Sequence, residues 1–299
     1  MIELLKNACF MMRDALAGTY TLRIFDNFLV LTWNIAPYFF IAILIQVLLR
    51  RFVQTKKMSF SVKSESLAIV TAALLGVLSP LPTYAAIPVA LSFMQTGLTF
   101  SAVLAFAIAS PLINPSVFFL TATQLGLTVA LIRLFASITI AIAGGFLIKW
   151  IKIDTTTKDK IVPLEQNRPF LIDFYRTSLY LGKYFLVALF LSAAVKALIS
   201  EEFISRLLGG QVGMSLLVAI ALGVPFYTCG GAALPLIDVL MEKGMSTASA
   251  IAFFIAGPAT KLETIYTYKS LLGTKILLFY LILTGLGAYL VGVLVLIFL

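Results

Sequence analysis

The stretch PFYTCGGAALP, residues 225–235, interrupts a part of the chain that is otherwise apolar enough to lie inside a membrane. It holds two prolines, two adjacent glycines and Cys229, one of the two cysteines in the sequence. Proline removes a backbone N–H and glycine permits non-helical conformations, so this composition predicts a break in a helix. Such a break is tolerated at membrane depth only where it is buried in protein or lines a wet cavity. We therefore expect this segment to belong to a site.

The composition indicates a polytopic membrane protein. Of the 299 residues, 61% are hydrophobic and 12% are charged, whereas about 25% are charged in ordinary globular domains. Residues 66–132 contain no Asp, Glu, Lys or Arg, and a membrane-crossing helix needs only about 20 mostly apolar residues. The net charge of +9 lies in short loops beside apolar runs. Basic residues there set topology and meet anionic lipid, so nucleic acid is not an expected partner.

The sequence repeats itself at a spacing of 147 residues. GVLSPLPTYAAIPVA begins at Gly76 and GVPFYTCGGAALPLI begins at Gly223, while AFAIASP (105–111) matches AFFIAGP (252–258). Matched prolines and glycines are stronger evidence than matched alanines, because they fix backbone geometry. Upstream, PYFFIAIL resembles KYFLVALF with the register slipped by one. Each half is predicted to contain a long helix, a broken region and a final long helix, at 27–49, 66–124 and 126–148 and again at 178–199, 212–270 and 275–298.

Loop charges predict that the two halves are inverted relative to each other. The loop 50–65 has five basic residues against one acidic residue, so the positive-inside rule places it in the cytoplasm. Its counterpart around 200–206 has two acidic residues and one basic residue. Equivalent loops on opposite sides require an odd number of crossings per half. Two inverted-topology repeats of about five helical segments each, with broken or re-entrant half-helices, satisfy this condition, and so do three crossings plus a re-entrant hairpin.

Four parts of the chain are predicted. The N-terminal stretch is too polar for the core of a signal peptide, and Leu5, Cys9, Met12 and Leu16 share one face of a helix. This pattern is typical of an amphipathic helix at the membrane interface. The parts are this interfacial helix (1–24), membrane repeat 1 (27–148), a cytoplasmic linker (149–176) and membrane repeat 2 (177–299).

Proline-bearing breaks fall at equivalent places in the two halves. Inverted repeats whose broken helices meet near the midplane build the substrate site of many secondary transporters. Asn114 and Pro115 are typical of a helix start, and Lys261 occupies the position of Asn114 in the second half. The alternative is that these prolines only kink buried helices for packing. The predicted hinge and break residues are Pro80, Pro82, Pro111, Pro115, Pro225, Gly231 and Pro258.

A few charged residues fall inside the apolar runs, where they usually face the protein interior or a cavity. Lys261 and Glu263 follow GPAT and are expected to line the pathway, although residues i and i+2 point apart on a helix, which disfavours a mutual pair. Asp238 and Glu263 are the carboxylates predicted for proton coupling, and Asp238 alternatively reaches the interface. Arg133 and Lys183 are expected to snorkel and to be structural.

Cys229 has two competing interpretations: a thiol that coordinates a soft ligand, or a small apolar residue with inert sulfur. The sequence has no His and no cysteine pair at metal-ligand spacing, so neither a metal site nor a cofactor is expected. Freed N–H groups at half-helix starts favour anions or lone-pair donors. The predicted substrate-binding residues are Cys229, Thr228, Tyr227, Gly230, Asn114, Lys261, Glu263, Thr83 and Tyr84.

The segment TCGGAALPLIDVLMEKGMSTASAIAFFIAGPAT (228–260) and its first-half echo (79–116) resemble the predicted permease family that includes ArsP, the organoarsenical efflux permease, and the YraQ-type proteins. The resemblance covers most of residues 27–298. It implies a multi-pass permease of the cell inner (cytoplasmic) membrane, and for ArsP-like members efflux of trivalent arsenicals and arsenic resistance. Many members have two cysteines one residue apart at this break, whereas here Tyr227 replaces the first. With only two cysteines, a three-thiolate arsenic site within one chain is excluded.

The sequence therefore predicts a permease that moves a small solute by alternating access, with membrane lipid as a further partner; a homo-oligomer is compatible with it. The alternative is a passive channel for a small solute or anion, because half-helices that meet at the midplane also build pores. An enzyme is not expected, since the chain lacks His and a G-x-S-x-G motif. A membrane partner without transport activity is the remaining class.

Overall fold

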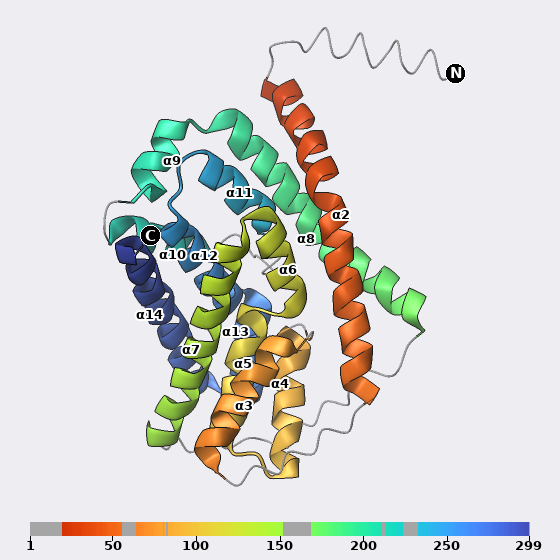
Figure 1. The fold of residues 1–299 in the computed structure, drawn as a ribbon, viewed down its shortest axis with the longest axis vertical. Coiled ribbons are helices and arrows are strands. Elements are labelled where there is room, and N and C mark those ends of the chain that lie inside the picture. Colours follow the sequence, from red (N-terminus) through yellow and green to blue (C-terminus); the bar gives the residue numbers. More distant parts are fainter. Residues whose placement is uncertain are drawn as a thin grey trace.

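The computed structural model is helical in every regular element that it describes, which confirms the predicted all-α membrane class (Figure 1). The described residues are 20–55, 64–79, 81, 83–151, 169–210, 213–223 and 233–298. Within them, five helical stretches are long and apolar enough to cross a membrane: Tyr20–Leu48, Phe100–Gln124, Leu127–Ile151, Phe170–Leu198 and Thr274–Phe298.

Much of the opening stretch lies outside the described residues, together with several other residues singled out from the sequence. These residues are Cys9, Pro80, Pro82, Pro225, Tyr227, Thr228, Cys229, Gly230 and Gly231. Their roles stay predictions.

The first half contains a long helix, two short helices, a helix interrupted near its middle and a second long helix. In chain order these are α2 (Tyr20–Thr55), α3 (Glu65–Leu78), α4 (Thr83–Ser92) with the short 3₁₀ turn η1 (Phe93–Thr96), α5 (Phe100–Leu112), α6 (Pro115–Gln124) and α7 (Leu127–Ile151).

The second half has the same order, with one more short helix after its first long one. Its helices are α8 (Phe170–Leu198), α9 (Glu201–Leu208), α10 (Met214–Gly223), α11 (Leu234–Glu242), α12 (Thr247–Thr260), α13 (Leu262–Leu271) and α14 (Thr274–Phe298).

The helix boundaries repeat at the spacing found in the sequence. Helices α13 and α14 begin and end 147 positions after α6 and α7. The turns repeat as well, because Gly97 and Gly244 have φ angles of 92° and 98°, and Gly126 and Gly273 have φ angles of 92° and 86°. Only glycine adopts such angles without steric cost, which explains why both halves have glycine at these turns.

Several boundaries differ from the predicted ones. Helix α2 is described from Tyr20, ahead of the predicted helix start at residue 27, and α7 and α8 reach into residues 149–176. The division of the chain into four parts stays a prediction. The segment around 200–206, expected to be a loop, forms α9. The predicted helices 27–49 and 126–148 end directly before Arg50 and Lys149, whereas Lys and Arg have good helix propensity and extend a helix beyond its apolar core.

Lengths distinguish crossing helices from shorter ones. Helix α3 has 14 residues and α4 has 10, which corresponds to roughly 21 Å and 15 Å, against about 30 Å of hydrocarbon. Figure 1 shows the chain turning back between them. Helices α5 and α6 together form a 25-residue stretch. These lengths favour three crossings and a re-entrant hairpin over five crossings in the first half.

The final long helices of the two halves run in opposite directions. A Cβ atom added at Gly287 would lie 2.7 Å from Ile140 Cδ1, and one added at Gly144 would lie 2.6 Å from Leu283 Cδ2. Moving four residues forward on α7 therefore moves the contact four residues backward on α14. In Figure 1, α7 descends from its junction with α6 while α14 rises to the C-terminus. The pair is antiparallel.

The first long helices of the halves also meet through equivalent residues. The rings of Phe39 on α2 and Phe185 on α8 stack with centroids 4.0 Å apart and an interplanar angle of 6°. These two residues match each other in PYFFIAIL and KYFLVALF. A contact between equivalent residues is what a two-fold relation between two copies produces.

Glycines allow the helices of each half to approach closely. A Cβ at Gly145 on α7 would lie 2.6 Å from Ile69 Cγ2, and a Cβ at Gly292 on α14 would lie 2.8 Å from Leu216 Cδ2. Both members of the second contact lie 147 residues after those of the first. Small residues at helix contacts are typical of membrane bundles, where lipid gives no hydrophobic drive for helix association.

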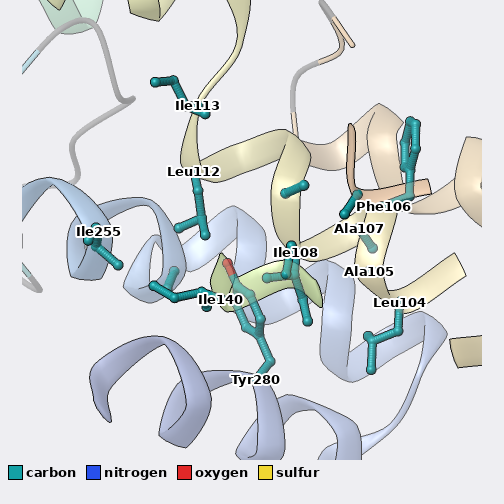
Figure 2. Close-up of a cluster of buried hydrophobic side chains, with 14 of the residues drawn as sticks. Leu104, Ala105, Phe106, Ala107, Ile108, Leu112, Ile113, Ile140, Ile255 and Tyr280 are labelled. Carbon is teal, nitrogen blue, oxygen red and sulfur yellow. The ribbon is translucent and has the colours of Figure 1, made fainter. Parts of the chain in front are cut away.

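The innermost helices are the two that lead into the interruptions. Every residue from Ser101 to Ser110 on α5 and from Ala248 to Ala259 on α12 is buried. Figure 2 shows the side chains of α5 in a cluster with Ile140, Ile255 and Tyr280 of other helices. A helix that is apolar on all sides is expected in the centre of a bundle.

The glycine contacts generate a prediction. Gly145→Ala should destabilise the protein by about 1–3 kcal/mol through overpacking, because the added methyl would also lie 3.1 Å from the Ser101 carbonyl oxygen. Gly285→Ala on α14 is the control, since a Cβ there has nothing within 4 Å, and helix propensity predicts a gain of up to about 1 kcal/mol. Thermal unfolding in detergent measures both. Equal effects would contradict the close approach.

Candidate functional site: the two helix breaks

The break between α5 and α6 consists of two extended residues. Ile113 has φ −156° and ψ 147°, and Asn114 has φ −144° and ψ 169°. The Oδ1 atom of Asn114 accepts a hydrogen bond from the Val117 N–H at 3.0 Å, and Pro115 follows as the first helical residue. Asparagine at the cap and proline after it are the preferred start of a helix, so the predicted cap is present.

The break between α12 and α13 is a single residue. Lys261 has φ −60° and ψ 134° and joins the two helices. The hydroxyl of Thr264 donates to the Pro258 carbonyl at 2.9 Å and so replaces one backbone hydrogen bond that the break removes. The helices adjoining this break meet the first half, because α13 packs against α4, whose first turn contains Thr83 and Tyr84.

Two of the predicted break residues lie inside helices instead. Pro111 is in the last turn of α5 and Pro258 is in the last turn of α12, and each helix ends one or two residues later. A proline lacks its own N–H and clashes with the carbonyl of residue i−4, so its effect falls on the turn before it. That turn is buried among other helices here, which hold its helical geometry.

Lys261 and Glu263 form an ion pair, with side-chain exposures of 5% and 25%. The carboxylate also accepts a hydrogen bond from the Tyr180 hydroxyl, and the Lys261 ammonium lies 5.5 Å from the ring centroid of Tyr184. The expectation that this pair is disfavoured was wrong, because Lys261 is in extended backbone and the helical i, i+2 geometry does not apply. Both tyrosines belong to α8, so the break is tied to the first long helix of its own half.

These two charges also suit the helix ends beside them. Lys261 follows the C-terminus of α12, and Glu263 lies in the first turn of α13. The partial negative charge at a helix C-terminus favours a cation, and the partial positive charge at an N-terminus favours an anion. The pair therefore stabilises the interrupted geometry as well as itself.

Arg133 on α7 is fully buried, and the expectation that it snorkels to the interface was wrong. Its Nη2 donates to the Leu112 carbonyl at 3.2 Å and its Nη1 to Thr121 Oγ1 at 3.1 Å. Its guanidinium carbon lies 4.4 Å from the centroid of the Phe254 ring. Leu112 is the last residue of α5, so Arg133 supplies a donor to a helix end that has lost its own partner.

Sequence reasoning missed Arg133, although one signal was available. Residues 66–132 and 134–148 contain no charged residue, so Arg133 stands alone in more than 80 apolar or neutral positions. An isolated charge in such a run points inward by default. Lys183, for which snorkelling was also expected, is exposed on α8.

The equivalent positions in the second half contain a different pair. Tyr268 and Tyr280 lie 147 residues after Thr121 and Arg133, and their rings stack with centroids 4.1 Å apart at 10°. Both pairs link the second piece of the broken helix to the following long helix. The two halves therefore share this contact but differ in its chemistry, which is a hydrogen-bonded cation in the first half and an aromatic stack in the second.

Asp238, the other predicted coupling carboxylate, is half-buried on α11. This helix packs against α8, α6 and α12, so it meets the second piece of the first-half break. Glu242, one turn further on, pairs with Lys196 at 2.6 Å. The structure thus brings α4, α6, α11 and α13 of the predicted site into contact across the two halves.

The ion pair predicts a specific coupling. Glu263→Gln should destabilise the protein by about 3–5 kcal/mol, because it leaves the buried Lys261 ammonium without its carboxylate. Lys261→Met should also destabilise it, whereas the double variant should recover part of the loss, since neither charge is then unpaired. Thermal unfolding of the wild type, the two single variants and the double variant gives a double-mutant cycle, from which the interaction energy of the pair is obtained. Additive losses would show that the pair does not stabilise the break.

Comparison with known proteins gives the family. A family model described as a predicted permease, ArsP_1, matches residues 21–297. The UPF0718 protein MJ0584 of Methanocaldococcus jannaschii is 30% identical over 96 residues, 32% of this chain and 26% of that protein. The UPF0718 protein YraQ of Escherichia coli K12 is 27% identical over 243 residues, 75% of this chain and 68% of that protein.

No solved structure matches the chain. The family match confirms the resemblance found in the sequence, and together with the apolar helices it indicates a multi-pass membrane transporter rather than an enzyme. The chain belongs to the ArsP_1 family of predicted permeases.

Proposed function

We propose that this protein moves a small solute across the inner (cytoplasmic) membrane by alternating access around the two helix breaks. The observation that carries the proposal is that the most deeply buried helices, α5 and α12, are the ones that end in the interruptions. A break is costly in a membrane and is retained where it builds a site. Packing alone would be served better by continuous helices.

The antiparallel arrangement of α7 and α14 supports an inverted repeat. Two copies of opposite orientation can exchange their conformations, and the exchange turns an inward-facing state into an outward-facing one. The loop charges point to the same arrangement, because the segment 50–65 is strongly basic and its counterpart around 200–206 is not.

A passive channel is the alternative, and the packing of the core favours a carrier. The residues of α5 from Ser101 to Ser110 are buried, and Figure 2 shows apolar side chains of this helix in one cluster with Ile140, Ile255 and Tyr280, so this part of the centre is closely packed. A channel needs a continuous polar path. In proteoliposomes, a carrier would give flux that saturates with solute concentration, whereas a channel would give flux that rises linearly.

The solute we propose to test first is a trivalent organoarsenical that is expelled from the cell. The support is Cys229 in the second-half break, since thiolates bind soft centres such as trivalent arsenic, together with the family resemblance. The neighbouring Tyr227, Thr228 and Gly230, and Asn114, Lys261 and Glu263 at the described breaks, are proposed to line the same site.

Efflux predicts lower accumulation of methyl- and phenyl-arsenicals in cells that express the protein. Cys229→Ser should restore accumulation to the level of cells without the protein, because serine is a hard ligand, and Cys9→Ser is the matched control that should leave efflux intact. Arsenic content of washed cells measures the result. If expression changes nothing, arsenicals are not the solute; the permease proposal then depends on other solutes.

The inverted repeat predicts the sides of two equivalent segments. A reporter inserted within residues 56–63 should be cytoplasmic, and one inserted between α8 and α9, at Ile199, should lie on the opposite side. Fusions to alkaline phosphatase and to a fluorescent protein distinguish the two sides. Placement of both reporters on one side would rule out inversion.

A further inference from the structure

The first-half break contains a buried cation without an anionic partner. Arg133 has five N–H donors, and in the described structure it uses two of them, with neutral acceptors on Leu112 and Thr121. Its Nε is buried and has no hydrogen-bond partner. Arginine keeps its charge inside proteins, so this cation cannot be removed by deprotonation.

The helices around Arg133 offer no carboxylate within reach among the described residues. Helices α5, α6 and α12, which contact α7, contain no acidic residue. Glu65 on α3 pairs with Lys149 at 3.3 Å, and Lys149 lies about 24 Å along α7 from Arg133. Asp238 on α11 has Glu242 of the same helix and Lys196 of α8 as its charged neighbours. Any anion that compensates Arg133 therefore comes from outside this set.

The break of the second half is electrically neutral, and its cation stands at the position of Asn114 rather than at that of Arg133. This break contains the buried cation of Lys261 and the carboxylate of Glu263, which neutralises it. The residue that corresponds to Glu263 at the spacing of 147 is Ser116, the second residue of α6. Ser116 is buried, and its hydroxyl has no hydrogen-bond partner.

The two unpartnered polar groups are the Nε of Arg133 and the hydroxyl of Ser116. Both belong to residues at the same break, because Arg133 contacts the last residue of α5 and Ser116 is the second residue of α6. Ser116 and Thr121, the residue that Arg133 contacts, are both on α6, about 7.5 Å apart along its axis and about 140° apart around it, so an anion that reaches both Ser116 and Arg133 would lie across the start of the helix. The N-terminus of α6 adds its own preference for negative charge. Buried polar groups are normally hydrogen-bonded, so the unpartnered Nε of the Arg133 cation and the unpartnered Ser116 hydroxyl indicate a missing ligand.

We propose that the first-half break binds one small anion per chain, with Arg133 as its counter-charge and Ser116 as a hydrogen-bond donor, at the position equivalent to the Glu263 carboxylate. The anion is either an anionic group of the transported solute or an inorganic ion bound as a fixed counter-ion. This site goes beyond the proposed function, because binding at Arg133 does not require transport.

Binding is tested with the full-length protein in detergent. The sodium salts of chloride, nitrate, formate, acetate and sulfate are titrated at constant ionic strength against the bulky sulfonate of HEPES, and the melting temperature is recorded. At least one anion should raise the melting temperature in a saturable way. Arg133→Met should abolish this rise, and Ser116→Ala should weaken the apparent affinity roughly ten- to a hundredfold, the loss of one hydrogen bond to a charged group.

Lys149→Met is the matched control, because it removes a cation from the same helix and should leave the anion dependence unchanged. The decisive variant is Ser116→Glu, which restores in the first half the carboxylate that Glu263 provides in the second. Without added anion it should melt above the wild type, and anions should no longer raise its melting temperature. This result would be informative even if Arg133→Met fails to fold.

A wild-type protein indifferent to all five anions, together with a Ser116→Glu variant less stable than the wild type, would overturn the proposal. Arg133 would then serve only to cap α5. Proteoliposome flux separates the two sources of the anion: a stabilising anion that is transported belongs to the solute, and one that is bound but not moved is a fixed counter-ion. Absence of any flux would contradict the proposed function and leave the binding result standing.

Discussion

The constraint that governs this structure is the hydrogen bonding of the backbone in lipid. A helix interrupted inside the membrane leaves N–H and C=O groups without helical partners, and lipid offers none. The protein meets this requirement with side chains. Asn114 caps the start of α6, Arg133 donates to the end of α5, and Thr264 donates to the end of α12. Each interruption is thus built as a hydrogen-bonded unit.

The same constraint explains where charge is found in the apolar part of the chain. A cation beside a helix C-terminus is favoured by the partial charge of that end, and an anion beside an N-terminus likewise. Lys261 and Glu263 follow this rule within one half, and Arg133 follows it in the other. The duplication kept the geometry of the breaks while the residues at equivalent positions diverged, from Asn114 to Lys261 and from Arg133 to Tyr280.

The repeat and the helix starts were predictable from the sequence, because they depend on residues whose local preference is strong. Proline and glycine restrict or free the backbone wherever they occur, so their spacing of 147 residues survives in the turns at Gly97 and Gly244. Asn114 followed by Pro115 is a local start signal, and the cap is present. The class of protein followed from composition in the same way.

Contacts between distant residues were not predictable, since they depend on how helices pack. The hydrogen bond of Tyr180 to Glu263 joins residues 83 positions apart, and nothing local marks Tyr180. The burial of Arg133 depends on α5, α6 and α12 surrounding it. The Lys261–Glu263 pair was misjudged because the i, i+2 geometry of a continuous helix was applied to it, although Lys261 was itself predicted at a helix start and adopts extended backbone. Helix boundaries were misplaced because hydropathy follows the apolar core rather than the hydrogen-bonded length.

The stack of Phe39 on Phe185 has a mechanical consequence. Because the stack joins equivalent residues of the two copies, its geometry is the same whichever copy is taken as the reference. If the copies swap shapes, as the proposed transport requires, this junction has no need to break, while contacts between non-equivalent residues must re-form. The crossing of α2 and α8 is therefore suited to act as a fulcrum, about which the remainder of each copy can rock.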